Sequence, residues 1–264
     1  MFEERNMKVH YFLILLFLSS CDVSRIYPKY YDPALLHIDI SYQPKPMAVD
    51  SLKEAKYVSA GINQKEISNR TKSYDLVSMI QSDLSRAHTF NGVNISYGIF
   101  GMAGYVENGL INKGEPYYYD KKSFLAVGAR GAVNTYFTRG NVDYRIIGAE
   151  FSYNKEYGDF ATFRKTIYDE LYYYSLHNTE LFTAGLTSEV ILHSRKKISS
   201  QLGARLFVGQ SFNITTYLGP IIGEGTRRPN VNSVQLSFFG QLNRFHGVLE
   251  TVSSGGQVRV GYRF

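Results

Sequence analysis

The chain contains no tryptophan and only one cysteine among its 264 residues. A single cysteine excludes a fold stapled by disulfides and any cysteine-rich metal site. No apolar run reaches about 18 residues, which excludes a bundle of membrane-spanning helices. Tyrosine (22) and phenylalanine (17) are abundant, and hydrophobic residues make up 44% of the chain. This composition is too apolar for a disordered protein and is typical of an all-β protein with amphipathic rings on its surface.

The first twenty residues have the layout of an export signal. Lys8 precedes an apolar stretch at 11–18, which is too short to span about 30 Å of hydrocarbon as a helix. The sequence Leu18-Ser19-Ser20-Cys21 then resembles the lipobox of bacterial lipoproteins. The resemblance implies cleavage before Cys21 and acylation of that cysteine. A plain signal whose cysteine is incidental stays open as the alternative.

Most of the remaining chain alternates between apolar and polar residues with a period of two. In the last segment Val258, Val260, Tyr262 and Phe264 share one face, and a helix would mix this face with Arg259 and Arg263. The same period recurs within the segments 93–99, 125–134, 147–153, 182–192, 202–209 and 234–242. These segments are therefore predicted to be β-strands.

Charged residues lie in the middle of the polar faces, among many glycines, which favours a membrane barrel with a polar lumen over a soluble sandwich. The proposed lumen residues are Arg130, Glu150, Glu189, Arg205 and Arg259. We expect the arginines to neutralise the glutamates, so that a narrow interior is filled rather than open.

The end of the chain resembles the C-terminal β-signal of bacterial outer-membrane barrels, carried by Val258, Val260, Tyr262 and Phe264. In such barrels a terminal aromatic residue marks the last strand for the assembly machinery. The resemblance implies a closed, antiparallel, up-and-down transmembrane β-barrel.

The lengths of the connections predict about ten strands, with eight as the alternative. Short gaps at 138–141 and 194–197 are expected to be periplasmic turns, and the long stretches 106–121, 154–179 and 210–232 to lie outside. Since the last strand must run toward the periplasm, a further strand is required at Val248–Val252, after a turn at His246-Gly247. The first two strands are predicted at 56–62 and 73–81, joined to the next by a turn at 82–90. Residues Leu36-Ile38-Ile40-Tyr42 are the alternative first strand.

Three segments follow from these patterns. Residues 1–20 form the signal peptide, and 21–54 contain the acylated cysteine and a proline-bearing extended tether. Residues 55–264 form the barrel. The clusters Tyr117-Tyr118-Tyr119 and Tyr172-Tyr173-Tyr174 are expected to form an aromatic girdle at the membrane interface, with ligand stacking as the alternative.

We expect no enzymatic activity, no metal and no cofactor. His193 and Ser194 are adjacent, so on a strand they face opposite sides, and the six histidines lack metal-ligand spacing. Arg227 and Arg228, on a proposed outer loop, are candidates for contact with lipopolysaccharide phosphates, and a solvated loop charge is the alternative. The net charge of +6 points to anionic headgroups rather than to nucleic acid in an exported protein.

The pattern as a whole resembles the small outer-membrane β-barrel lipoproteins of Bacteroidetes-type envelopes, in which a lipobox precedes a barrel. The resemblance is architectural and implies a bacterial outer-membrane protein anchored through Cys21. Its partners would be outer-membrane lipid, lipopolysaccharide and the barrel-assembly and lipoprotein-processing machinery, with the oligomeric state left open. A structural or surface-interaction role is expected. The alternatives are a lipid-tethered soluble barrel similar to lipocalins, with its apolar face inward, and an envelope lipid hydrolase.

Overall fold

The computed structural model describes residues 29–46, 53–69, 73–109, 117–167, 173–194, 200–212, 231–252 and 255–264. Cys21, Arg227 and Arg228 lie outside these described residues. The long strands are β2 (Glu54–Asn69), β3 (Ser73–Thr89), β4 (Val93–Glu107), β5 (Lys121–Thr135), β7 (Val142–Tyr157), β9 (Glu180–His193), β10 (Ser200–Phe212), β11 (Val231–Leu242), β12 (Phe245–Val252) and β13 (Gly255–Arg263). The short elements are β1 (Lys29–Tyr31), β6 (Phe137–Arg139), α2 (Asp159–Thr166) and β8 (Tyr173–Ser175). Within the described ranges, no helix has both the length and the apolar character needed to cross a membrane.

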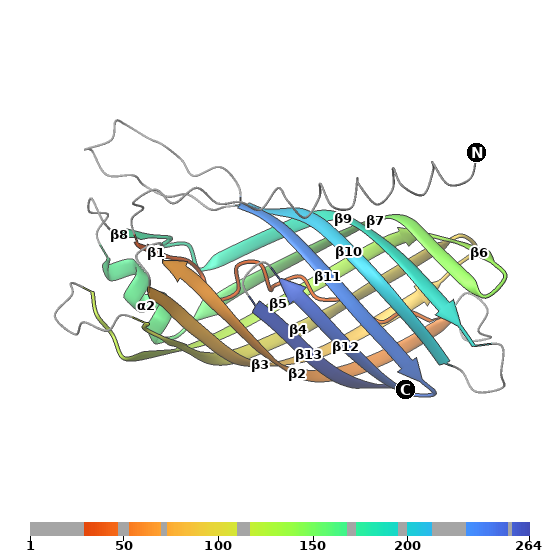
Figure 1. Cartoon of the computed structure of the whole chain (residues 1–264), viewed down its shortest axis with the longest axis horizontal. Coiled ribbons are helices and arrows are strands. Elements are labelled where there is room, and N and C mark those ends of the chain that lie inside the picture. Colours follow the sequence, from red (N-terminus) through yellow and green to blue (C-terminus); the bar gives the residue numbers. More distant parts are fainter. Residues whose placement is uncertain are drawn as a thin grey trace, which may run out of the picture.

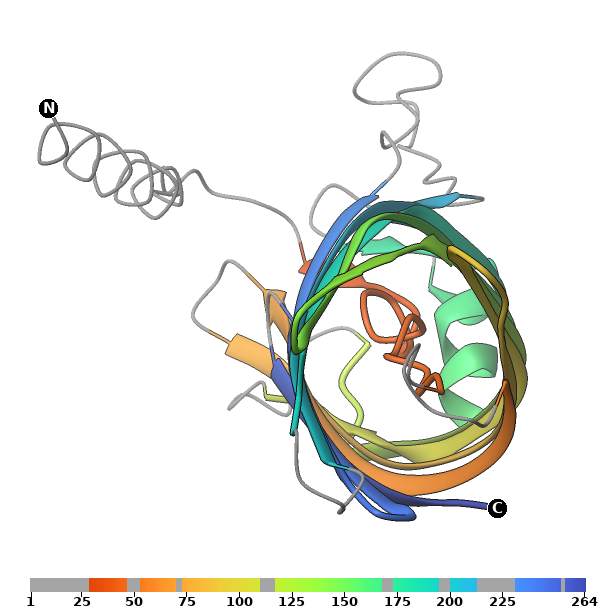
Figure 2. The same ribbon diagram turned by 90° about the vertical axis from the view of Figure 1, so that its right-hand side faces the viewer.

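The long strands form one closed antiparallel barrel (Figures 1 and 2). The sheet has eleven strands, and ten of them make the wall because β6 is only a short addition alongside β7. The wall closes where β13 pairs with β2, for example Val258 with Ile62, and where β5 and β9 both pair with β7. The predicted closed up-and-down barrel of about ten strands is therefore confirmed. Among the described residues, closure gives each of the ten wall strands a hydrogen-bonded neighbour on both sides.

The first strands are longer than the periodicity predicted. β2 has 16 residues and β3 has 17, so β3 continues through the region 82–90 that was expected to be a turn. The turn lies instead at 90–92, where Gly92 has φ of 76°. The prediction was wrong because the outward positions beyond Leu84 carry Arg86 and His88, and these polar residues end the apolar pattern before the strand ends.

The strand required by the parity argument is present as β12, which covers Val248–Val252. Its preceding turn was misplaced, since His246 and Gly247 lie within the strand. The turn is made by Asn243 and Arg244, and Asn243 has the left-handed φ of 55° that two-residue hairpin turns require.

Apolar side chains point away from the barrel axis all around the wall. Ile62, Ile80, Leu186 and Val260 are each at least 64% exposed, whereas polar and charged residues on the alternate positions are buried in the lumen. The soluble lipocalin-like alternative required the opposite orientation and is wrong for this reason.

The two ends of the barrel differ. β3, β5, β9, β11 and β13 end at one end of the barrel, together with Phe264, and we call it the short-turn end. β2, β4, β7, β10 and β12 end at the other, which we call the long-loop end because the longest stretches of sequence between wall strands follow β4, β7 and β10. In Figure 1 the short-turn end is on the right, near the label C.

Residues 31–46 lie inside the barrel, and we call them the plug. Figure 2 shows this segment in the middle of the ring, beside α2. All of its residues except Asp32 and His37 are buried. The expected extended tether is therefore wrong for these residues, and Leu36, Ile38, Ile40 and Tyr42 do not form a wall strand. Their apolar character serves burial against the inner wall.

The long-loop end of the lumen is closed by an apolar cluster. Tyr31, Leu35 and Ile38 of the plug pack with Phe100 and Phe124 of the wall. Three residues from the connections between wall strands complete it: Tyr119, Phe160 of α2 and Ile167. Tyr119 is only 4% exposed, so this member of the first tyrosine cluster is a core residue and does not belong to an interface girdle.

Candidate functional site: the plugged lumen

A chain of ion pairs crosses the inner wall and forms the electrostatic centre of the lumen. Its six members come from six different strands, namely Arg130 (β5), Asp83 (β3), Arg259 (β13), Glu250 (β12), Arg205 (β10) and Glu150 (β7). We call these residues the charged belt. Positive and negative charges alternate along it, and every member is at most 8% exposed.

The contacts along the belt are short and continuous. Arg130 lies 2.7 Å from Asp83, whose other oxygen lies 3.4 Å from Arg259. Arg259 lies 2.9 Å from Glu250, which lies 3.8 Å from Arg205. Arg205 ends the chain with two hydrogen bonds to Glu150, one of them 3.1 Å long. Each buried charge therefore has an opposite charge beside it, which is the condition for burying ions at tolerable cost.

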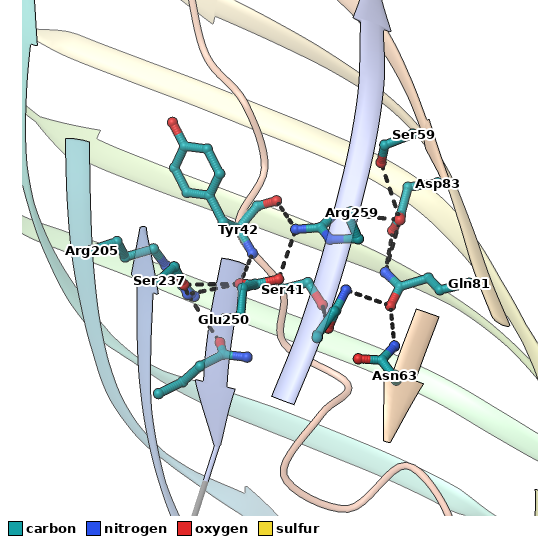
Figure 3. Close-up of polar contacts among 12 residues, drawn as sticks. Ser41, Tyr42, Ser59, Asn63, Gln81, Asp83, Arg205, Ser237, Glu250 and Arg259 are labelled. Atoms are coloured by element: carbon teal, nitrogen blue, oxygen red, sulfur yellow. Dashed lines mark hydrogen bonds and ion pairs between the residues drawn. The ribbon is translucent and has the colours of Figure 1, made fainter. Parts of the chain in front are cut away.

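The plug is bound into this belt through its backbone (Figure 3). The N–H of Tyr42 donates to Glu250 at 2.8 Å, and the carbonyl of Tyr42 accepts from Arg259 at 2.7 Å. The carbonyl of Asp39 accepts from Arg130 at 2.6 Å. Because every substitution except proline keeps the backbone N–H and carbonyl groups, these contacts hold the path of the chain largely independently of the side chains that the plug carries.

The side chain of Tyr42 adds an apolar contact. Its ring stacks on Phe239 of β11, with 3.9 Å between centroids and 12° between planes. An aromatic pair of this kind adds about 0.5–1.5 kcal/mol beyond the area buried.

Amide and hydroxyl groups fill the space beside the belt (Figure 3). Gln81 accepts from Asn63 at 3.1 Å and from Gln257 at 2.9 Å, and its own amide donates to Asp83. Gln257 in turn accepts from Ser41 of the plug at 3.3 Å. These bonds join the plug to β2, β3 and β13, the strands on both sides of the barrel closure.

A second buried cluster holds the plug toward the short-turn end. Nζ of Lys45 lies 2.5 Å from one carboxylate oxygen of Glu189, and Arg145 lies 2.6 Å from the other. Closer to the short-turn end, the hydroxyl of Thr89 donates to the carbonyl of Pro46 at 3.2 Å. The last residue of the plug is thus fixed to the end of β3.

A third cluster holds the plug near the long-loop end. The N–H of Ala34 donates to Glu156 at 2.8 Å, and Lys65 donates to the carbonyl of Leu36 at 2.7 Å. The other oxygen of Glu156 lies 3.0 Å from Arg164 of α2. The helix, the plug and the wall therefore share one carboxylate.

The structure brings together Arg205 and Glu150 among the five predicted lumen residues, and it buries all five. Arg130 and Arg259 pair instead with Asp83 and Glu250, while Glu189 pairs with Lys45 and Arg145. The expected partners were incomplete because strand register, which sequence alone does not show, decides which side chains meet.

Arg145 was missed for a local reason. Strict alternation places it on the same face as Ile147, but the pairing of β7 with β9 is irregular between Arg145 and Gly148. This bulge leaves both Ile146 and Ile147 exposed and turns Arg145 into the lumen, where it is 1% exposed. Asp83 and Lys45 were missed because the segments containing them were expected to be a turn and a tether.

The residues of the proposed β-signal form β13 and its end. Val258 and Val260 face outward, and the rings of Tyr262 and Phe264 meet edge to face with centroids 5.2 Å apart. The N–H of Phe264 donates to the carbonyl of Lys56 at 3.0 Å, so the last residue completes the pairing with β2.

His193 and Ser194 differ in their surroundings. His193 is buried and lies 2.9 Å from Asp143, whereas the neighbouring Ser194 is exposed. Among the described residues no group of three His, Cys, Asp or Glu side chains is arranged to hold a metal ion.

No protein family and no curated protein matches the sequence. Among solved structures, the chain is similar to the β domain of the Bordetella autotransporter BrkA, with 13% identity, 80% of this chain and 99% of that chain covered, and a TM-score of 0.45. It is also similar to an outer membrane channel from Pseudomonas putida, with 7% identity, coverage of 84% and 100%, and a TM-score of 0.39. The translocator domain of the autotransporter NalP from Neisseria meningitidis matches with 8% identity, coverage of 82% and 90%, and a TM-score of 0.36. These neighbours are outer-membrane β-barrel domains, but at such TM-scores the fold assignment rests on the strand pairing of this chain itself.

Proposed function

We propose that this protein is a lipid-anchored β-barrel of a bacterial outer membrane, with a closed lumen and a structural or surface-interaction role carried by its long loops. The observation that carries the proposal is the plug, which is bonded to the inner wall along its whole length. An open diffusion channel requires a continuous aqueous path, and the plug occupies it. We propose no enzymatic role.

Membrane insertion is supported by the outer surface of the wall. Apolar side chains are exposed on every long strand from β2 to β13, and the closed ladder satisfies the backbone hydrogen bonds that hydrocarbon cannot. In the proposed orientation the short-turn end faces the periplasm and the long-loop end faces outward, as in other bacterial barrels.

Conductance measurements test the closed lumen. In planar lipid bilayers the intact protein should show no steady channel current, whereas a variant that lacks residues 31–46 should conduct steadily. The shift in gel mobility between unboiled and boiled samples shows whether the variant has folded. A large steady conductance of the intact protein, or a folded deletion variant that stays closed, contradicts the proposal.

If the deletion variant does not fold, a milder change serves the same purpose. Lys45→Met together with Glu250→Gln weakens two attachments of the plug and leaves its length unchanged. This variant should show brief openings that the intact protein lacks. A folded double variant without openings counts against the plug as the barrier.

Lipid anchoring through Cys21 has its own test. Cys21→Ser should abolish incorporation of labelled palmitate. Assembly in the outer membrane should continue, because Val258, Val260, Tyr262 and Phe264 are unchanged. Palmitate incorporation that persists in the variant contradicts the proposed anchor.

We also propose that Arg227 and Arg228 contact lipopolysaccharide phosphates, since guanidinium groups bind phosphate in a bidentate manner. Replacing both by Gln should lower retention of lipopolysaccharide by the purified barrel. Equal retention by the variant and the intact protein favours the solvated-loop alternative.

A further inference from the structure

The path of the plug shows on which side of the barrel the chain enters. β1 pairs in parallel with β8, Lys29 opposite Tyr173, and β8 belongs to the connection between β7 and β9 at the long-loop end. The N–H of Leu176 also donates to the carbonyl of Tyr31 at 3.1 Å. In Figure 1, β1 and β8 lie together at the left end, away from the label C.

From there the plug descends through the lumen in one direction. Ala34 is bonded to Glu156 near the long-loop end of β7, Tyr42 to Glu250 on β12, and Lys45 to Glu189 near the short-turn end of β9. Pro46 then reaches Thr89, the last residue of β3.

The strand that follows begins at the short-turn end. The carbonyl of Lys53 accepts from the N–H of Thr89 at 2.7 Å, and Glu54 opens β2 opposite His88. Residues 29 and 54 therefore stand at opposite ends of the barrel, and the lumen between them is filled.

We infer that the chain upstream of Lys29 leaves the barrel at the long-loop end, so that the barrel displays its own N-terminal segment, and any acyl chains on Cys21, on the same side of the membrane as its long loops. The inference deepens the proposed function, since with the proposed orientation this side is the cell surface and the acyl chains enter the outer leaflet.

The reach of the chain supports the assignment of the leaflet. Cys21 is eight residues before Lys29, and a fully extended chain spans at most about 3.6 Å per residue, or about 29 Å. β3 has 17 residues, which at about 3.3 Å each and a tilt of about 40° make a wall about 43 Å high. A lipid on Cys21 therefore falls short of the headgroups at the short-turn end.

Besides filling the lumen, the plug determines on which side of the membrane the N-terminal segment lies. A lipoprotein held in the periplasmic leaflet has its N-terminus at the periplasmic end of any barrel that follows. Here the contacts of residues 34–46 are incompatible with that arrangement, because they require the segment to run from the long-loop end. The plug thus sets the side on which the lipid and the residues beside it are presented.

Epitope accessibility on intact cells tests the inference. One tag is inserted between Ser24 and Arg25, a second between Gly223 and Glu224 in the β10–β11 connection, and a third between Arg195 and Lys196 in the β9–β10 connection. The first and second tags should both be accessible on intact cells, while the third tag should be inaccessible. The inference is overturned if the first tag has the same accessibility as the third tag and the second tag has the opposite accessibility.

The same experiment separates this inference from the proposed orientation. If the first and second tags are both hidden and the third is accessible, the orientation is wrong but the shared side of N-terminus and long loops stands. Cys21→Ser with the first tag provides the matched control for lipidation. Its tag should stay on the side of the long loops, because the plug and not the lipid sets the path.

Proteolysis of the untagged protein gives a second measurement if a tag prevents folding. In sealed vesicles, trypsin should cut at Arg25 and at Arg227 in the same molecules, and leave Arg195 intact in those molecules. If the molecules cut at Arg195 are also cut at Arg25 while Arg227 is protected, the inference is overturned.

Discussion

Nζ of Lys45 in the plug lies 2.5 Å from a carboxylate oxygen of Glu189 in the wall, and neither side chain is exposed. The pair joins a segment that precedes the barrel to a strand of the wall, and the two residues are 144 positions apart in the sequence. A contact of this kind forms only when the barrel has closed around the plug. It therefore reports directly on whether the plug is in place.

Lys45→Met should lower the free energy of unfolding by about 2 kcal/mol, the size of a lost charged hydrogen bond. Glu189 keeps Arg145 at 2.6 Å, so the carboxylate is not left unpaired. Urea unfolding in vesicles measures the change. Lys155→Met is the matched control, because its pair with Glu180 is exposed and screened by solvent. Equal losses in the two variants contradict a specific role for Lys45.

Asp83→Asn should be more damaging than the loss of an exposed ion pair on the barrel surface. Asp83 pairs with both Arg130 and Arg259, and its loss leaves two buried guanidinium groups short of a counter-charge. The expected cost is about 3–5 kcal/mol, measured as a shift in the urea midpoint. Glu54→Gln on the adjoining strand breaks an exposed pair with Arg86 and should have little effect. If Asp83→Asn shifts the urea midpoint no more than Glu54→Gln does, the charges of the belt do not stabilise the barrel.

Ile80→Arg tests the membrane assignment. Ile80 is 64% exposed near the middle of β3, so an arginine there meets hydrocarbon and should cost about 2–4 kcal/mol. Leu242→Arg, at the end of β11 beside a short turn, is the control and should cost about 0–1 kcal/mol. Folding titrations in lipid vesicles measure both. A barrel that stands in water shows no such dependence on depth.

Tyr119 predicts a specific response to alkaline pH. Burial and the neighbouring carboxylate of Asp75, which accepts a hydrogen bond from the Tyr119 hydroxyl at 2.9 Å, raise the pKa of Tyr119 above its usual range. The unfolded chain releases this proton above about pH 10 while the folded chain holds it. The stability that depends on the protonated form is therefore complete below about pH 10 and is lost as the pH rises further.

Tyr119→Phe should accordingly reduce the loss of stability between pH 9 and pH 11, although the variant is less stable at neutral pH because the bond to Asp75 is gone. The midpoint of unfolding, followed by gel mobility across this range, measures the slope. Tyr118→Phe is the neighbouring control and should keep the slope of the unchanged protein. Identical slopes for the two variants refute the assignment to Tyr119.

The wall of the barrel followed from local pattern. The alternation of Val258, Val260 and Tyr262 with Arg259 and Arg263 was enough to assign β13, because a strand sends successive side chains to opposite faces. Connection lengths then required β12, although its pattern was too short to be found by periodicity. Where polar residues faced outward, as at Arg86 and His88, the same reasoning ended a strand too early.

The partners of the lumen charges did not follow from pattern. Periodicity selected Arg205 and Glu150 as inward residues, but a bulge hid Arg145 and an unexpected strand extension hid Asp83. Register and bulges depend on contacts between distant strands. A single sequence therefore indicates on which face of a strand a charged residue lies, but it does not indicate with which other charged residue it pairs.

The sequence by itself determined that this protein is a β-barrel with apolar side chains outside and charged side chains inside, since apolar and polar residues alternate along each strand. Only the tertiary structure decided what fills the barrel. Within residues 31–46, Leu36, Ile38, Ile40 and Tyr42 alternate with polar residues like a strand, yet they form none. Their burial exists only because the closed wall surrounds them. The physical reason is that a plug is stabilised by side chains from many strands at once, and these side chains meet only after the sheet has closed.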